Sequence, residues 1–96
     1  MSSWLFTDPP TLGVVTLHRI IQDDAPILHV CHDGDDGSWL FLELGSPSEE
    51  DAAVISLETV VTIDPSLVEL ADLPMGWHAW RIARSDPWER EPISYA

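Results

Sequence analysis

The sequence predicts a single α+β domain whose antiparallel sheet of four or five strands is centred on a hairpin over residues 27–44. Three observations lead to this fold class. Two apolar runs flank a turn in that hairpin, further apolar runs of strand length occur near 53–56 and 77–82, and apolar residues recur at helical spacing near 16–22 and 57–71. Two or three short helices are expected to pack on one face of the sheet.

The hairpin has the clearest pattern. Residues 27–32 and 39–44 are apolar runs of strand length, and residues 33–37 between them are only Asp and Gly. Gly adopts positive φ without steric cost, and Asp bonds its own backbone in tight turns. Neither run is half polar, so both strands are expected at the centre of the sheet.

The segment before the hairpin predicts a short helix over 16–22. Thr16 is a candidate N-cap, and the proline at position 26 ends the helix because the residue before proline is pushed out of the α region. Val14 and Val15 could form a short strand ahead of it.

The segment after the hairpin contains three candidate helix starts and one short strand. Ser48–Asp51 matches a capping box, which predicts a brief helical turn before the strand near 53–56. Ser56 is a good cap for the next helix. Asp64 followed by Pro65 is the clearest helix start in the chain, with Asp64 as N-cap and Pro65 at the first helical position.

The chain is expected to be one domain over residues 1–96. Pro and Gly within 73–76 predict a turn before the last strand. The body is expected to cover about 12–84. Residues 1–11 and 85–96 are expected to be peripheral, the second as a partly ordered tail.

Composition limits the class of protein. An apolar fraction of 45% and five tryptophans argue against disorder. No apolar run approaches the roughly 20 residues that span a bilayer, and the first residues show no secretory signal. The single cysteine, Cys31, excludes an internal disulfide framework and suits a reducing compartment, so a cytoplasmic location is expected.

Charge is the most unusual bulk property. Seventeen acidic residues stand against four arginines and no lysine, which gives a net charge of −13. Residues 1–80 hold one arginine and fourteen acids, so the negative charge belongs to the folded body. Direct binding to nucleic acid or to an anionic membrane needs clustered basic residues and is not expected. The charge indicates either solubility or an acidic face for a basic partner.

A series of short motifs supports a family resemblance. They are Asp36-Gly37-Ser38-Trp39-Leu40-Phe41, the acids around Glu49, Ser56-Leu57-Glu58-Thr59-Val60, Asp64-Pro65-Ser66-Leu67, Leu73-Pro74 with Gly76, and Trp80-Arg81. The chain thereby resembles a family of small bacterial domains of unknown function, some classed as immunity proteins of polymorphic toxin systems. The resemblance covers roughly residues 12–82. It implies a fold and an interaction role, and it supplies no catalytic residue.

Metal sites are not expected. Counted from Asp33, Gly37 occupies a position where an EF-hand loop needs an oxygen ligand, so the calcium motif fails. His29 and Cys31 point the same way on one strand, but zinc needs further ligands, and His78 would have to arrive from another strand. No metal and no cofactor are therefore predicted.

Catalytic residues are not expected either. His32 with Asp33, or Cys31 with His29, could form a base or a thiolate couple. Neither a Gly-x-Ser-x-Gly elbow nor a phosphate-binding glycine loop accompanies them, and the acidic surroundings would raise the pKa of the thiol. A small hydrolase or metal-binding protein using His29, Cys31 and His32 stays an alternative.

Surface tryptophans suggest an interface. Trp39 and Trp80 are expected to pack in the core or on the sheet, and the other three are expected to be partly exposed, where tryptophan often anchors interfaces. The candidate interaction residues are Asp33, Asp35, Asp36, Glu49, Glu50, Asp51, Trp4, Trp77 and Trp88.

These observations predict a small acidic cytosolic protein-interaction module, immunity-like, that binds an unidentified basic protein through an acidic, Trp-bearing surface. Two alternatives stay open besides the hydrolase. One is a nucleic-acid mimic, whose carboxylates would lie in rows and occupy a DNA-binding protein. The other is a homodimer.

Overall fold

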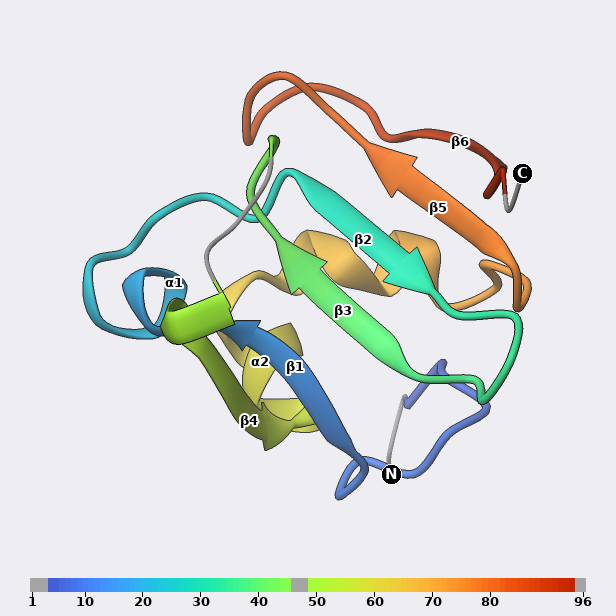
Figure 1. Cartoon of the computed structure of the whole chain (residues 1–96), viewed down its shortest axis with the longest axis horizontal. Coiled ribbons are helices and arrows are strands. Elements are labelled where there is room, and N and C mark those ends of the chain that lie inside the picture. Colours follow the sequence, from blue (N-terminus) through green and yellow to red (C-terminus); the bar gives the residue numbers. More distant parts are fainter. Residues whose placement is uncertain (1–3, 46–48, 95–96) are drawn as a thin grey trace.

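A six-stranded sheet organises the chain (Figure 1). The computed structural model describes residues 4–45 and 49–94. The strands are β1 (Gly13–Leu17), β2 (His29–His32), β3 (Trp39–Leu42), β4 (Ala52–Ser56), β5 (Trp77–Trp80) and β6 (Glu89–Pro92). The helical elements are α1 (His18–Gln22), the 3₁₀ turn η1 (Glu49–Asp51), α2 (Leu57–Ile63) and the 3₁₀ helix η2 (Pro65–Leu70).

The predicted hairpin is confirmed at the centre of the sheet. The strand order is β4-β1-β3-β2-β5-β6, so β2 and β3 are the two innermost strands. They pair antiparallel from His29 opposite Leu42 to His32 opposite Trp39. The turn closes through the Asp33 amide, which donates to the Ser38 carbonyl at 2.8 Å, and Gly37 supplies a φ of 75°.

The expectation of an antiparallel sheet of four or five strands is correct only in part. β1 lies between β3 and β4, parallel to the first and antiparallel to the second, so the sheet is mixed. Thr16 is not the N-cap of a helix. It belongs to β1, where its buried hydroxyl donates to the Phe41 carbonyl at 2.8 Å. The first helix therefore begins only at His18.

Within the C-terminal segment, expected to be a partly ordered tail, residues 89–92 form the sixth strand of the sheet. β6 pairs antiparallel with β5, with Trp80 opposite Glu89 and Trp77 opposite Pro92. The last predicted strand is shorter than expected, since β5 ends at Trp80. The N-terminal segment also joins the body, because Phe6 is buried in the core.

The helices α2 and η2 lie behind the sheet in Figure 1. Their predicted caps are confirmed: the Ser56 hydroxyl accepts a hydrogen bond from the Thr59 amide at 3.2 Å, and Asp64 Oδ1 accepts one from the Ser66 amide at 3.1 Å. Residues 65–70 form a 3₁₀ helix, with Pro65 at its start. Of the predicted capping box, Glu49–Asp51 form η1 and Ser48 lies outside the described residues.

The core lies between one face of the sheet and these helices. Side chains alternate between the two faces along a strand, and Val30, Phe41 and Ala79 are buried on the face toward the helices. Leu17 and Leu42 are also buried, at the ends of their strands. Fully buried side chains from both layers are Val14, Val30, Trp39, Phe41, Leu57, Val60, Leu67 and Leu70. Most of the hydrophobic core thus lies on one side of the sheet, and within residues 4–45 and 49–94 no helix covers the middle of the other face (Figure 1).

A buried guanidinium joins the sheet to η2. Arg81 is 2% exposed, and its Nη2 donates to Asp64 Oδ2 at 2.6 Å. Its Nε and Nη2 both donate to the Ile27 carbonyl, at 3.2 and 3.0 Å. Its Nη1 donates to the Ser66 hydroxyl and the Arg84 carbonyl. The same carboxylate that caps η2 therefore also neutralises this arginine.

Replacing Arg81 is expected to destabilise the fold strongly. Arg81→Met leaves the Asp64 carboxylate buried without its cation, which typically costs about 3 kcal/mol or more of unfolding free energy. Arg84→Met is the matched control, because that side chain is 52% exposed and should change stability by less than about 1 kcal/mol. Urea unfolding followed by tryptophan fluorescence measures both, and equal losses would contradict a special role for the buried pair.

Candidate functional site

The predicted acidic turn lies at one end of the hairpin. The Asp35 amide donates to Asp33 Oδ1 at 2.7 Å, and the Ser38 amide donates to Asp36 Oδ1 at 2.9 Å. Two of the three carboxylates thus hold the turn's own backbone. Hydrogen bonds from the Ser38 side chain and then its amide lower the pKa of Asp36, so this carboxylate stays ionised at neutral pH.

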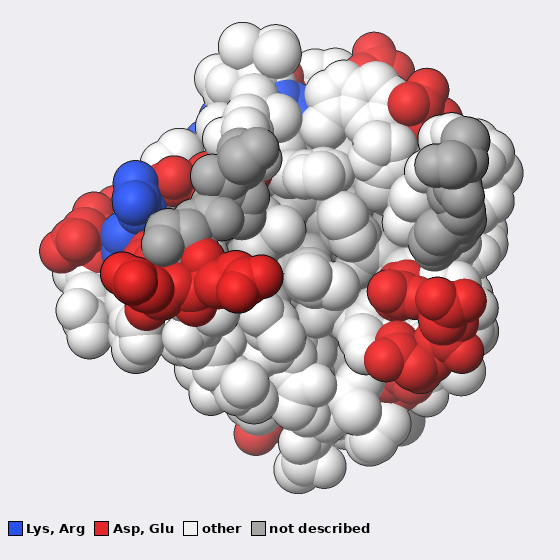
Figure 2. Space-filling view, in the orientation of Figure 1, with Lys and Arg blue, Asp and Glu red and all other residues white. Residues whose placement is uncertain are grey.

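The second predicted acidic group lies in η1, away from the turn. Arg19 bridges it to the sheet: its Nε lies 3.2 Å from Asp51 Oδ2 and its Nη1 lies 3.3 Å from Glu43 Oε2. Figure 2 shows these carboxylates on one side of the uncovered face and those of the hairpin turn on the other. The two groups therefore flank a surface and do not form one continuous patch.

The three candidate tryptophans lie at separate places in the fold, and Trp77 is the one beside the hairpin turn, opposite His32. Trp4 packs on Phe6, with 5.5 Å between ring centroids. Trp77 lies on the helix side of the sheet and packs against the core. Trp88 lies under the Arg81 guanidinium, 4.1 Å from its carbon, and also packs against the core. All three are half-buried, as expected, but they support the fold from separate places.

The uncovered face presents a row of residues that crosses all six strands. Cross-strand partners share a face, so the pairing register fixes this row. In strand order it runs Val54, Val15, Leu40, Cys31, His78 and Glu91. A neighbouring partial row holds Leu42, His29, Trp80 and Glu89.

This face is uncharged in its middle and acidic at its rim. Figure 2 shows white atoms across the centre and red carboxylates near η1, near the hairpin turn and near β6. Val54 is 73% exposed on the outer strand β4. The sequence predicted a candidate surface of acids and tryptophans and did not predict the apolar centre of this face. An apolar residue on an inner strand is expected in the core whichever face of the sheet it occupies.

Two imidazoles meet in the middle of the uncovered face. His29 Nε2 lies 3.0 Å from His78 Nδ1, and Cys31 Sγ lies 3.5 Å from the same His29 nitrogen. At the other end, His78 Nε2 lies 3.4 Å from Glu91 Oε1. The four side chains form a chain of polar contacts across β2, β5 and β6. Of the predicted cluster, His29 and Cys31 come together and His32 lies on the opposite face.

Burial disfavours the charged form of two members of this cluster, His29 and Cys31. Burial, followed by the neighbouring His78, lowers the pKa of His29. Burial, followed by the Asp33 charge, raises the pKa of Cys31, so the group is a thiol at neutral pH and a weak nucleophile. Within residues 4–45 and 49–94, no group of three or more His, Cys, Asp or Glu residues is arranged to hold a metal ion. In this cluster one proton can be shared between His29 Nε2 and His78 Nδ1, which lie 3.0 Å apart.

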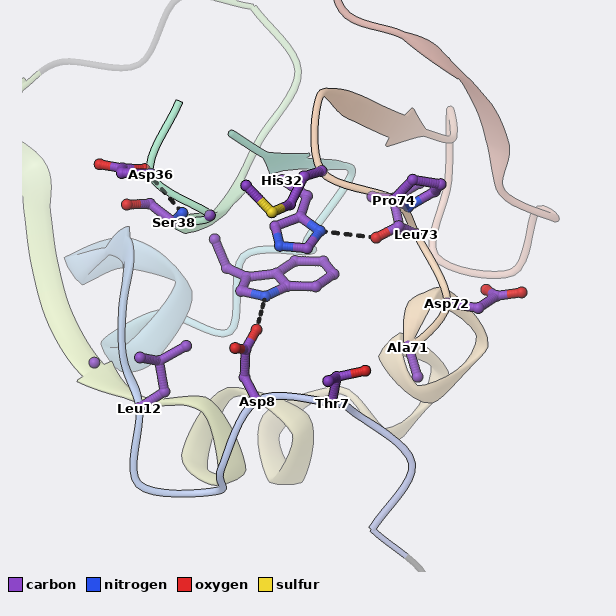
Figure 3. Close-up of a pocket in the computed structure, with 14 residues that line it drawn as sticks. Thr7, Asp8, Leu12, His32, Asp36, Ser38, Ala71, Asp72, Leu73 and Pro74 are labelled. Carbon is purple, nitrogen blue, oxygen red and sulfur yellow. Dashed lines mark hydrogen bonds between the residues drawn. The ribbon is translucent and has the colours of Figure 1, made fainter. Parts of the chain in front are cut away.

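A pocket of about 560 Å³ opens on the helix side of the sheet, beside the hairpin turn (Figure 3). His32 stacks on Trp39, with 3.8 Å between centroids and 15° between planes. His32 Nδ1 donates to the Leu73 carbonyl at 2.8 Å, and the Trp39 indole N–H donates to Asp8 Oδ2 at 2.8 Å. Three separate segments line the pocket, within residues 7–13, 32–39 and 71–75, and the sequence carries no motif that joins them.

No family model matches the chain, and no curated protein or solved structure matches it significantly. The resemblance to small bacterial domains therefore stays a prediction. Among the described residues, every helix is too short or too polar to cross a membrane.

Acidification is expected to destabilise the fold through His29. In the unfolded chain His29 binds a proton with the ordinary pKa of 6.5, whereas in the folded chain it binds the proton less readily. The contribution of neutral His29 to the free energy of unfolding is therefore complete above about pH 6.5 and is lost as the pH falls toward the folded pKa. The difference in unfolding free energy between about pH 7 and about pH 5 should shrink in His29→Asn. His18→Asn, on exposed α1, is the control, and an equal change in both variants would contradict the assignment.

Cys31 is expected to react slowly with iodoacetamide at neutral pH. Its raised pKa leaves little thiolate, so the rate should fall below that of free glutathione and recover when urea unfolds the protein. Asp33→Asn should raise the rate only slightly, because burial is the larger cause of the shift. Mass spectrometry of timed samples measures alkylation. A rate equal to that of glutathione in the folded protein would show that the thiol is activated.

Proposed function

We propose that this protein is a small interaction module that binds a basic protein partner through the uncovered face of its sheet. The observation that carries the proposal is the row from Val54 to Glu91, which sets apolar side chains on an open sheet face between acidic borders. Interfaces commonly have such an anatomy, with an apolar core and a polar rim.

The face is large enough for a specific interface. The view onto it is along the shortest axis of the molecule, whose outline in that direction measures 38 by 32 Å. A standard interface covers about 800 Å² on each partner, which fits within that outline. Trp80 and His78 lie side by side there, with 5.2 Å between ring centroids, and offer an aromatic anchor of the kind that dominates binding energy.

The negative charge of the protein indicates a basic partner. The chain carries a net charge of −13, and carboxylates lie at three places along the edge of the face, near η1, the turn and β6. A partner with an apolar centre and a basic rim would be steered toward it and held in one orientation. Two copies of this chain would bring acidic rims against each other, which disfavours a homodimer through this face.

The alternatives have less support. A nucleic-acid mimic needs rows of carboxylates, whereas on this face they form separate groups around an uncharged middle. A hydrolase based on His29, Cys31 and His32 would need side chains from both faces of the sheet. An immunity role, as the family resemblance implies, is one form of the proposed function: a basic toxin would be neutralised by occlusion.

A pair of valine variants tests the proposal. Val54→Glu places a carboxylate within the row, and Val68→Glu places one on η2, which lies behind the sheet. Wild type and both variants serve as bait for the native host's lysate at low and at moderate salt. We expect one basic protein to be retained by wild type and Val68→Glu, to be lost with Val54→Glu, and to weaken as salt rises.

The control separates contact from charge. Both substitutions make the bait more acidic, so selective loss with Val54→Glu would show that binding needs the apolar row. Equal retention by both variants would place the interface elsewhere. If the bait retained only further copies of itself, the proposal would be wrong and the face would be a site of self-association. Analytical ultracentrifugation would check this outcome.

A further inference from the structure

We propose that the pocket beside the hairpin turn binds an organic ammonium or guanidinium cation with a short apolar stem. The pocket lies on the helix side of the sheet, whereas the proposed partner surface lies on the other. The two sites are therefore independent, and each can fail without the other.

The charge of the pocket favours a cation. Three carboxylates stand among its fourteen lining residues, Asp8, Asp36 and Asp72, and none of those lining residues is a lysine or arginine. Asp72 is paired outward with Arg90 at 2.9 Å. Asp8 and Asp36 are held by uncharged donors, the Trp39 indole and Ser38, so their negative charges remain uncompensated locally.

The hydrogen-bonding groups of the pocket are mostly acceptors. Because a carbonyl cannot donate, the bond to Leu73 places the proton of a neutral His32 on Nδ1 and leaves Nε2 as an acceptor. The Asp8 carboxylate uses Oδ2 for the indole, which leaves its second oxygen as a further acceptor. An ammonium or guanidinium group carries only donors and complements this set.

The apolar walls of the pocket indicate that the cation carries an apolar stem. Leu12, Trp39, Leu73, Pro74 and Met75 supply apolar surface between the polar groups. Its volume, about 560 Å³, is within the range of small-molecule sites. A bare metal ion would leave this surface unused, whereas an amine on an aliphatic stem would contact both kinds of wall.

The test uses the full chain and defined probes. Putrescine is titrated into ¹⁵N-labelled protein, with 1,4-butanediol as a neutral isostere of the same length. We expect putrescine, and not the diol, to shift the Trp39 indole N–H and the amides of residues 36–38, with a Kd of about a millimolar or tighter. A lysine blocked at both ends carries the same amine on a peptide backbone. Tighter binding of that probe would assign the source to a protein side chain, and tighter binding of putrescine would assign it to a free metabolite.

Matched variants locate the site. Asp36→Asn should weaken putrescine binding by about fivefold, and Asp8→Asn, which retains an acceptor for the indole, should weaken it further. Asp35→Asn removes the same charge from the same turn but does not line the pocket, and it should leave Kd within about twofold. Val54→Glu on the far side should also leave it unchanged.

The results divide clearly. Equal shifts with the diol would show that charge does not select the ligand. Equal weakening by Asp35→Asn and Asp36→Asn would show that the cation follows the overall charge of the protein and not the pocket. The absence of shifts at Trp39 and residues 36–38 with both amines would overturn the proposal.

Discussion

The buried Arg81–Asp64 pair is the constraint on which much of the structure depends. One guanidinium holds the carbonyl that precedes β2, the cap of η2 and the turn after β5, while Trp88 covers its outer face. An ion pair at this depth is favourable only when further hydrogen bonds satisfy its remaining donors, and Arg81 has five. The strand end, the 3₁₀ helix and the C-terminal segment therefore meet at one residue.

The segments that the Arg81–Asp64 pair holds together lie on one side of the sheet, and most of the core lies on that side. The helices α2 and η2 and the segments held by Arg81 complete a hydrophobic layer on that side. On the opposite face the apolar side chains are half-buried or buried apart from the exposed Val54, no helix of the described residues covers the middle, and carboxylates lie at the rim. An exposed apolar patch with a polar border often marks a place where something binds. The division of the sheet into two faces thus links the fold to the proposed function.

Local chemistry allowed part of this structure to be predicted. The Asp/Gly turn and the caps at Ser56 and Asp64 depend on residues close in sequence, and all were foreseen. The place of β1 was not, because parallel pairing with β3 depends on distant residues and leaves no local pattern. The charged sequence of β6 resembles a tail, although charges and proline are common on edge strands.

The candidate sites were foreseen less well than the fold. Acids and tryptophans stand out in a sequence by composition, but what they contact depends on register. His29 and Cys31 were expected to share a face, whereas their contact with His78 depends on β5 pairing with β2. The pocket is assembled from three segments that lie far apart in the sequence, and no motif joins them. Tertiary proximity of this kind has no signature in a single sequence.

The position of β1 also determines when the sheet can be completed. Both neighbours of this strand, β3 and β4, come later in the chain, and the helix-side core that covers it comes later still. During synthesis β1 therefore emerges before either of its partners, while the hairpin of β2 and β3 can close locally as soon as it emerges. Loop closure must precede such long-range pairing, and this slows folding. β1 therefore joins the sheet only after the hairpin that follows it in the sequence has emerged.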